Sequence, residues 1–150
     1  MEFLTSHPID VAMVGALVLR PGHGAVTTFV GHVRDHHRGR AVARLDYSAY
    51  APMAEREMAQ VVADACSHWD VAVEVRHRIG MLEIGDVAIA GAVGSGHRDA
   101  GFAACRFVVD EVKRRVPIWK REWFTDGTSE WVDPTGQSSL GDDPAEHALG

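Results

Sequence analysis

Cysteine and lysine are both scarce in this sequence, because its 150 residues include only two of each. Cys66 and Cys105 both fall in segments with helical periodicity, so we interpret them as small buried side chains rather than a disulfide pair or nucleophiles. This sparing use of cysteine favours a reducing compartment, the cytoplasm. The apolar runs at residues 11–19 and 87–93 are too short to span a bilayer. The first ten residues lack the basic segment of a signal peptide.

Basic residues are absent after Arg121, although the sequence contains 15 of them. Seven of its 21 acidic residues lie from Glu122 onward, so the net charge of −6 is concentrated at the end of the chain. The remainder is nearly neutral and has no broad basic face of the kind that binds nucleic acid. We expect a single domain over residues 1–133, followed by a mobile acidic tail at residues 134–150 that has no periodicity.

The hydrophobic pattern predicts an α+β fold with a mainly antiparallel sheet and two main helices. The helices are expected at residues 52–69, opened by Pro52, and at residues 99–115, ended by Pro117. Strands are expected at residues 25–33, 42–50, 71–79, 86–94, 118–124 and 130–132, whereas residues 11–19 fit a short helix or a strand. The first two strands are predicted to pair with each other, and the almost wholly apolar segment at residues 86–94 is predicted to be central.

Lys113 and Lys120 are the first candidates for catalysis. A sequence that uses arginine for its other 13 cationic positions has a specific use for lysine where an amine must lose its proton, which a guanidinium cannot do. The neighbouring guanidinium groups of Arg114, Arg115 and Arg121 are expected to lower the lysine pKa values. The alternative is that these residues are a basic helix end that complements the helix dipole.

A second candidate is Gly94-Ser95-Gly96-His97-Arg98, which lies at a strand-to-helix junction. Backbone N–H groups at the helix start, together with His97 and Arg98, could hold a phosphate. The motif is not a nucleotide-binding fingerprint. The alternative is that Ser95 caps the helix while His97 and Arg98 face solvent.

The histidine-rich segment around residues 31–37 invites a metal hypothesis. His32 and His36 span a strand end and a loop, without the helical spacing of a zinc site, and no cysteine lies nearby. We therefore expect no metal, and we interpret Arg34 as an anion ligand or an exposed strand-end charge. A metal-dependent hydrolase that uses His32, His36 and His37 is a third functional reading.

Three segments in order, residues 24–34, 94–98 and 113–122, resemble the large subunit of molybdopterin synthase, the MoaE family. Residues 77–80 and 84–86 resemble its central segment. The most specific part is the stretch from Lys113 through Pro117 to Lys120, Arg121 and Glu122. The resemblance extends from about Gly24 to Trp131.

The resemblance implies an α/β hammerhead fold and a homodimer that forms a heterotetramer with a ubiquitin-like small subunit ending in a Gly-Gly thiocarboxylate. It implies transfer of sulfur from this MoaD-like partner to cyclic pyranopterin monophosphate, which yields the dithiolene of molybdopterin without a resident cofactor. Lys113 and Lys120 would be catalytic, either one serving as the base. The implied substrate-binding residues are His32, Val33, Arg34, His97, Arg98, Lys113, Lys120, Arg121 and Glu122. The family often has lysine at the position of His32.

His97 and Lys113 lie near opposite ends of one expected helix, roughly 24 Å apart at 1.5 Å per residue. One small substrate does not reach both within a chain, so we expect a site shared across a homodimer. The alternative to an enzyme is a non-catalytic adaptor that docks a ubiquitin-like partner.

Overall fold

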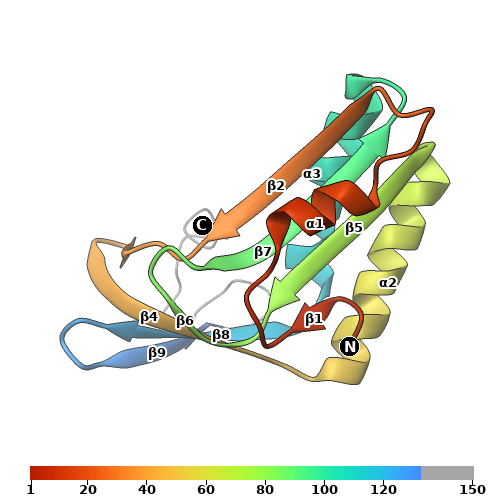
Figure 1. Ribbon diagram of the computed structural model, residues 1–150. Helices are drawn as coiled ribbons and strands as arrows, with labels where there is room; N and C mark the ends of the chain where they lie inside the picture. The colour runs from red at the N-terminus through yellow and green to blue at the C-terminus, as the bar shows by residue number, and fades with distance from the viewer. Residues whose placement is uncertain (133–150) are drawn as a thin grey trace.

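Residues 1–132 are described by the structure, a computed structural model (Figure 1). The predicted tail at residues 134–150 lies outside them. In chain order the elements are β1 (Leu4–Thr5), α1 (Val11–Leu17), β2 (Ala25–His32), β3 (His36–His37), β4 (Arg40–Ala49), α2 (Ala51–His68), β5 (Val71–Arg78), β6 (Gly80–Glu83), β7 (Val87–Ser95), α3 (Arg98–Arg115), β8 (Ile118–Phe124) and β9 (Ser129–Val132). The α+β class predicted from the sequence is confirmed.

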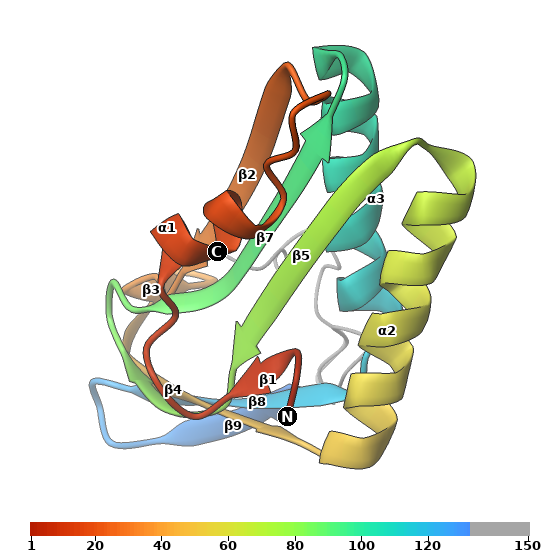
Figure 2. The ribbon, with the colours of Figure 1, turned by 45° about the vertical axis from the view of Figure 1, so that its right-hand side comes forward.

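The first sheet has the strand order β1-β5-β7-β2. β7 pairs antiparallel with both β5 and β2, and all its residues after Val87 are buried, as expected for the central strand. The two long helices, α2 and α3, cover one face of this sheet, and α1 lies on the other (Figures 1 and 2). The main core forms between α2, α3 and the sheet, around Met58, Val61, Val75 and Ile89.

The second sheet has the strand order β3-β4-β8-β9, and β6 also pairs with β4. It runs across one end of the first sheet, which gives the expected hammerhead shape (Figure 1). The prediction that residues 25–33 and 42–50 pair with each other was wrong, because β2 pairs with β7 while β4 pairs with β3, β6 and β8. Side-chain alternation identifies the face that a strand buries but not its neighbour.

A tight turn at Arg38 and Gly39 joins β3 to β4. Both residues have positive φ, 55° and 75°, as the two central residues of a type I′ hairpin turn require. The turn sets the register in which His37 lies opposite Arg40. It thereby returns His37 to the body of the second sheet, where its side chain is buried.

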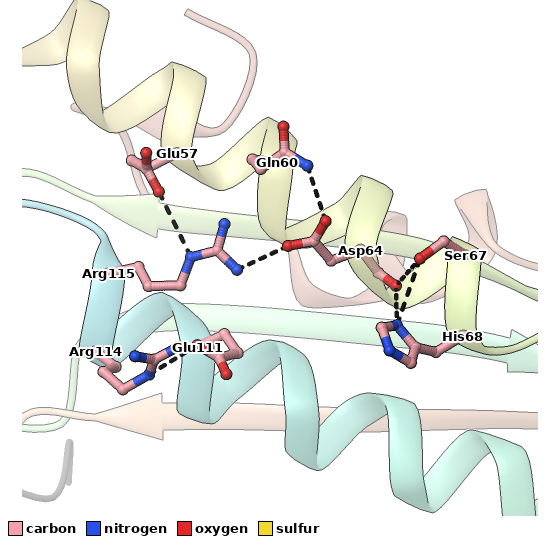
Figure 3. A network of polar contacts seen from close by, with 8 residues as sticks. All are labelled: Glu57, Gln60, Asp64, Ser67, His68, Glu111, Arg114 and Arg115. Carbon is pink, nitrogen blue, oxygen red and sulfur yellow. Dashed lines mark hydrogen bonds and ion pairs between the residues drawn. The ribbon is translucent and has the colours of Figure 1, made fainter.

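Polar contacts join the two long helices at their exposed edge (Figure 3). Arg115 of α3 contacts Asp64 at 2.8 Å and Glu57 at 3.5 Å, both on α2. Asp64 also accepts a hydrogen bond from Gln60. Arg114 instead binds Glu111, one turn earlier on its own helix. Arg115 therefore joins α3 to α2, whereas the ion pair of Arg114 lies within α3.

Candidate active site

Lys113 lies in the last turn of α3, and its side chain is partly buried. Its pKa is lowered to about 8, first by burial, then by the positive charges of Lys120 and Arg34, with Asp110 acting in the opposite direction. Burial removes the water that stabilises an ammonium, and a neighbouring like charge disfavours it further. A considerable fraction of Lys113 is consequently a neutral amine near physiological pH.

Lys120 lies in β8, directly opposite Tyr47 of β4. Its side chain is 15% exposed, and its Nζ atom is 3.8 Å from Oε1 of Glu122. Burial is the largest cause of its lowered pKa, Arg34 lowers it further, and Glu122 raises it. Lys120 is therefore a second amine whose charge is disfavoured by its surroundings.

Arg34 follows β2 and has an exposed side chain. Its charge acts on Lys113, Lys120 and Tyr47. The fold thus brings together three residues that the sequence singled out, from the end of β2, the end of α3 and the middle of β8. Three cationic groups in one place provide a site for an anionic molecule.

The expected cause of the lysine pKa shifts was wrong. Arg114 and Arg115 are held by carboxylates on α2 and α3, as Figure 3 shows. Arg121 extends from the opposite face of β8, where it stacks against Trp123 at 4.3 Å and donates to Ser129 Oγ at 3.0 Å. Their proximity in sequence suggested that these guanidinium groups lower the lysine pKa values. In the fold, burial and the charge of Arg34 lower them instead.

Glu122 lies on the same face of β8 as Lys120, as the alternation predicted, but it is 2% exposed. One carboxylate oxygen, Oε2, is 2.6 Å from Nδ1 of His37, and the other faces Lys120. Glu122 is therefore an internal partner of the lysine. Burial leaves its carboxylate little surface with which to contact a substrate.

The sequence analysis missed Tyr47, and it considered His37 only as a metal ligand. Tyr47 is 3% exposed, and burial followed by the negative charge of Glu122 raises the pKa of its phenol. The alternation of Leu45 and Tyr47 along β4 could have placed Tyr47 on the lysine face, given the pairing of β4 with β8. No sequence pattern indicated the contact of His37 with Glu122, because the two residues lie 85 positions apart.

His32 and Val33 are held by hydrogen bonds to Gly85 and Asp86. The exposed His32 ring bonds to the carbonyl of Gly85 through Nδ1, at 2.9 Å. Val33 has its side chain in the core of the second sheet, its N–H donates to Asp86, and its carbonyl accepts from Gly85. Of the segment His32 to Arg34, the exposed guanidinium is therefore the group best placed to meet a ligand.

His97 and Arg98 lie at the opposite end of α3 from Lys113. Both are exposed, and His97 occupies the N-cap position. Ser95 does not cap the helix through a backbone N–H; its hydroxyl donates to the His97 carbonyl at 2.6 Å. Within one chain, Arg98 lies away from Lys120 because it is at the far end of α3. Arg121 lies away from Lys120 because it points from the opposite face of β8.

The histidines of the metal hypothesis do not converge. His36 is exposed and bonds to Asp35, whereas His37 points inward to Glu122. Within residues 1–132, no group of three or more His, Cys, Asp or Glu side chains is arranged to hold a metal. Nor does any helix in that part of the chain have the length and apolar character needed to cross a membrane.

The two cysteines differ from each other. Cys105 is buried as expected, but Cys66 is exposed, so the expectation of two buried residues was wrong for Cys66. Burial raises the pKa of both thiols, which keeps them protonated and poorly nucleophilic. The groups of this site that are suited to proton transfer and anion binding are therefore the amines of Lys113 and Lys120 and the guanidinium of Arg34.

Comparisons with known proteins point to one family. A family model described as MoaE protein matches residues 4–115. A molybdopterin synthase catalytic subunit from Nostoc is 40% identical over 131 residues, covering 86% of this chain and 79% of the relative. The crystal structure of molybdopterin synthase from Staphylococcus aureus superimposes with a TM-score of 0.83 at 35% identity, covering 87% of this chain and 96% of that one. A complex of subunits 1 and 2 of molybdopterin-converting factor from Helicobacter pylori has a TM-score of 0.70, covers 91% of each chain and, at 16% identity, shares the fold.

Proposed function

Because this chain belongs to the MoaE protein family, we propose that it is the catalytic subunit of a molybdopterin synthase. The reaction transfers sulfur from a small subunit to cyclic pyranopterin monophosphate and forms the dithiolene of molybdopterin. The observation that carries the proposal is the convergence of the only two lysines with Arg34, since both amines have lowered pKa values in one electropositive site.

The site suits this chemistry in its charge and its protonation. Arg34 attracts the phosphate of the substrate, and the ammonium form of either lysine orients the thiocarboxylate of the small subunit. As the thiocarboxylate sulfur bonds to a substrate carbon, that ammonium protonates the oxygen that leaves the carbon. The neutral form of the other lysine then accepts a proton from the water that hydrolyses the acyl–sulfur bond, which leaves the sulfur on the pterin and releases the end of the small subunit as a carboxylate. The sulfur arrives on the partner, so the protein requires neither a nucleophilic cysteine nor a resident cofactor.

The partner in this proposal is a ubiquitin-like, MoaD-like protein whose Gly-Gly end carries the thiocarboxylate. The Helicobacter pylori structure is a complex of subunits 1 and 2 of molybdopterin-converting factor, and the chain that matches in it shares the fold described here. We place the enzyme in the cytoplasm, where its two unpaired cysteines remain reduced.

Two copies of the chain complete the site. His97 and Arg98 lie a full helix away from Lys113, roughly 24 Å at 1.5 Å per residue. In a homodimer, the neighbouring subunit supplies these two side chains to the lysines, and one small subunit docks at each of the two sites. Mixing inactive Lys113→Ala and His97→Ala proteins should restore activity, because a mixed dimer contains one intact site. If the mixture stays inactive although mixed dimers form, the shared site is wrong.

Reconstitution separates this function from that of an adaptor. The purified chain, a thiocarboxylated small subunit and cyclic pyranopterin monophosphate should yield dithiolene product. Lys113→Ala should abolish product while small-subunit binding persists. An adaptor would bind the small subunit equally well in both forms and produce nothing in either.

A further inference from the structure

Three side chains form a buried polar chain beside the reacting amines. His37 Nδ1 lies 2.6 Å from Glu122 Oε2, and Glu122 Oε1 lies 3.8 Å from Lys120 Nζ. A carboxylate only accepts hydrogen bonds, so Nδ1 carries the proton and donates it. His37 and Glu122 are 7% and 2% exposed. The β3–β4 hairpin and the pairing of β4 with β8 bring the two residues together across the second sheet.

The two distances differ in kind. At 2.6 Å, His37 and Glu122 form a short, charge-assisted hydrogen bond. At 3.8 Å, Lys120 lies beyond the 2.7–3.2 Å of a hydrogen bond, so the carboxylate acts on it chiefly through charge. A buried carboxylate needs a partner. His37 supplies one to Oε2, and Lys120 thereby avoids a close ion pair that would hold its proton.

The other charged or titratable groups around Lys120 come from several elements. Lys113 on α3, itself influenced by Asp110, and Arg34 after β2 are cations. Tyr47 lies opposite Lys120 on β4, and the His77 ring of β5 packs against it at 5.0 Å. Glu122 is the group among these that raises the Lys120 pKa. Its orientation therefore controls how readily Lys120 releases a proton.

We propose that His37 is a positioning residue that fixes the Glu122 carboxylate and keeps it from closing onto Lys120. Its role in catalysis rests on the proposed function, but the arrangement itself does not. When His37 is removed, Glu122 turns toward Lys120 and forms a direct ion pair with it. The pKa of Lys120 then rises, and less of the neutral amine is present at a given pH.

The scarcity of lysine allows a direct measurement. Protein labelled with ¹³C at lysine Cε gives two side-chain signals, because the chain has two lysines, and Lys113→Arg assigns them. We expect His37→Ala to raise the titration midpoint of Lys120 by roughly half a unit to one unit. His37→Asn, whose amide N–H can replace Nδ1–H, should restore the wild-type midpoint. An unchanged or lower midpoint in His37→Ala overturns the proposal.

His36→Ala is the matched control. His36 is the neighbour of His37 in β3 and also binds a carboxylate, Asp35, at 2.9 Å, but its side chain is 63% exposed. It should leave the Lys120 midpoint unchanged. If His36→Ala shifts the Lys120 midpoint as much as His37→Ala does, then loss of either imidazole of β3 has this effect, and the positioning role of His37 is refuted.

A double-mutant comparison tests whether His37 acts through Glu122. Glu122→Gln removes the charge and should lower the Lys120 midpoint, and adding His37→Ala should then cause no further change. A further upward shift, or no decrease in Glu122→Gln, contradicts the proposal. If His37→Ala does not fold, His37→Asn decides the matter: a Lys120 midpoint that rises in this variant contradicts the proposal, and one that stays at the wild-type value supports it.

The pH dependence of sulfur transfer in the reconstituted enzyme links the arrangement to catalysis. If Lys120 is the base, the acid side of the rate profile in His37→Ala should move to higher pH together with the Lys120 midpoint; if Lys113 is the base, the Lys120 midpoint should move while the acid side of the profile stays. If the Lys120 midpoint rises in His37→Ala but the reconstituted wild-type enzyme shows no turnover under any condition, the proposed function is refuted and the positioning role stands. Turnover with an unmoved midpoint refutes the positioning role alone.

Discussion

Replacing Lys113 with arginine tests the central claim about this site. Arginine retains the positive charge and much of the length of lysine but does not lose its proton at any relevant pH. If Lys113 acts as a neutral amine, the variant should bind the small subunit and an anionic substrate yet fail to turn over. If the residue serves only as a positive charge, the variant should remain active.

The magnitude follows from the lowered pKa. With a pKa of about 8, about a quarter of Lys113 is neutral at a pH of about 7.5, whereas at the ordinary 10.5 only about 0.1% would be. The fold therefore increases the neutral-amine fraction of Lys113 by roughly two hundredfold. Loss of a positioned proton-transfer group typically costs 10²–10⁴-fold in rate, so we expect a decrease within that range.

Single-turnover sulfur transfer, measured from pH 6 to 9 in the reconstituted enzyme, provides the assay. The wild-type rate should rise with pH and level off above about 8, because deprotonation creates the active form. Arg114→Ala is the control, since Arg114 is adjacent in the chain but bonds to Glu111; it should retain the wild-type profile. A flat wild-type profile, or near-normal turnover in Lys113→Arg, would refute the reasoning.

Two further predictions concern stability. Gly94→Ala should destabilise the protein by about 1–3 kcal/mol in urea denaturation, because its Cβ would lie 2.1 Å from the Val18 carbonyl oxygen and 2.5 Å from His23 Nδ1; unchanged stability would show that α1 shifts readily against β7. Asp64→Asn should lower the melting temperature at pH 7, because the Arg115 hydrogen bond holds the Asp64 pKa below 3.8. The Asp64 carboxylate stabilises the fold above its unfolded pKa, and this contribution disappears as the pH falls through the lower folded value. The difference between Asp64→Asn and wild type should therefore vanish in strong acid, and a constant difference across the pH range would contradict the ion-pair explanation.

Local patterns were sufficient for most of the secondary structure. Pro52 and Pro117 bracket the two long helices because proline favours a first helical turn and cannot continue a last one. The apolar run at residues 86–94 indicated a central strand because a strand covered on both faces has no polar side. The two-residue strands β1 and β3 and the short strand β6 were missed, since so few residues carry no detectable period.

Composition identified Lys113 and Lys120, because their rarity among 15 basic residues is visible without a structure. The charged groups that surround the two amines could not be identified from composition. Arg114 and Arg115 are the nearest cations in sequence, but a helix turns 100° per residue and directs them toward carboxylates on α2 and α3. Arg34, roughly 80 residues before Lys113, is the guanidinium that acts on both lysines.

The sequence by itself determined the two long helices, most strands, the family resemblance and the choice of Lys113 and Lys120 as candidate catalytic residues. Only the tertiary structure decided which strands are neighbours, that Glu122 is buried, and that His37 bonds to it from 85 positions away. The physical reason is that periodicity records which side of an element is buried, whereas pairing and electrostatic contact depend on which distant segments the folded chain brings together.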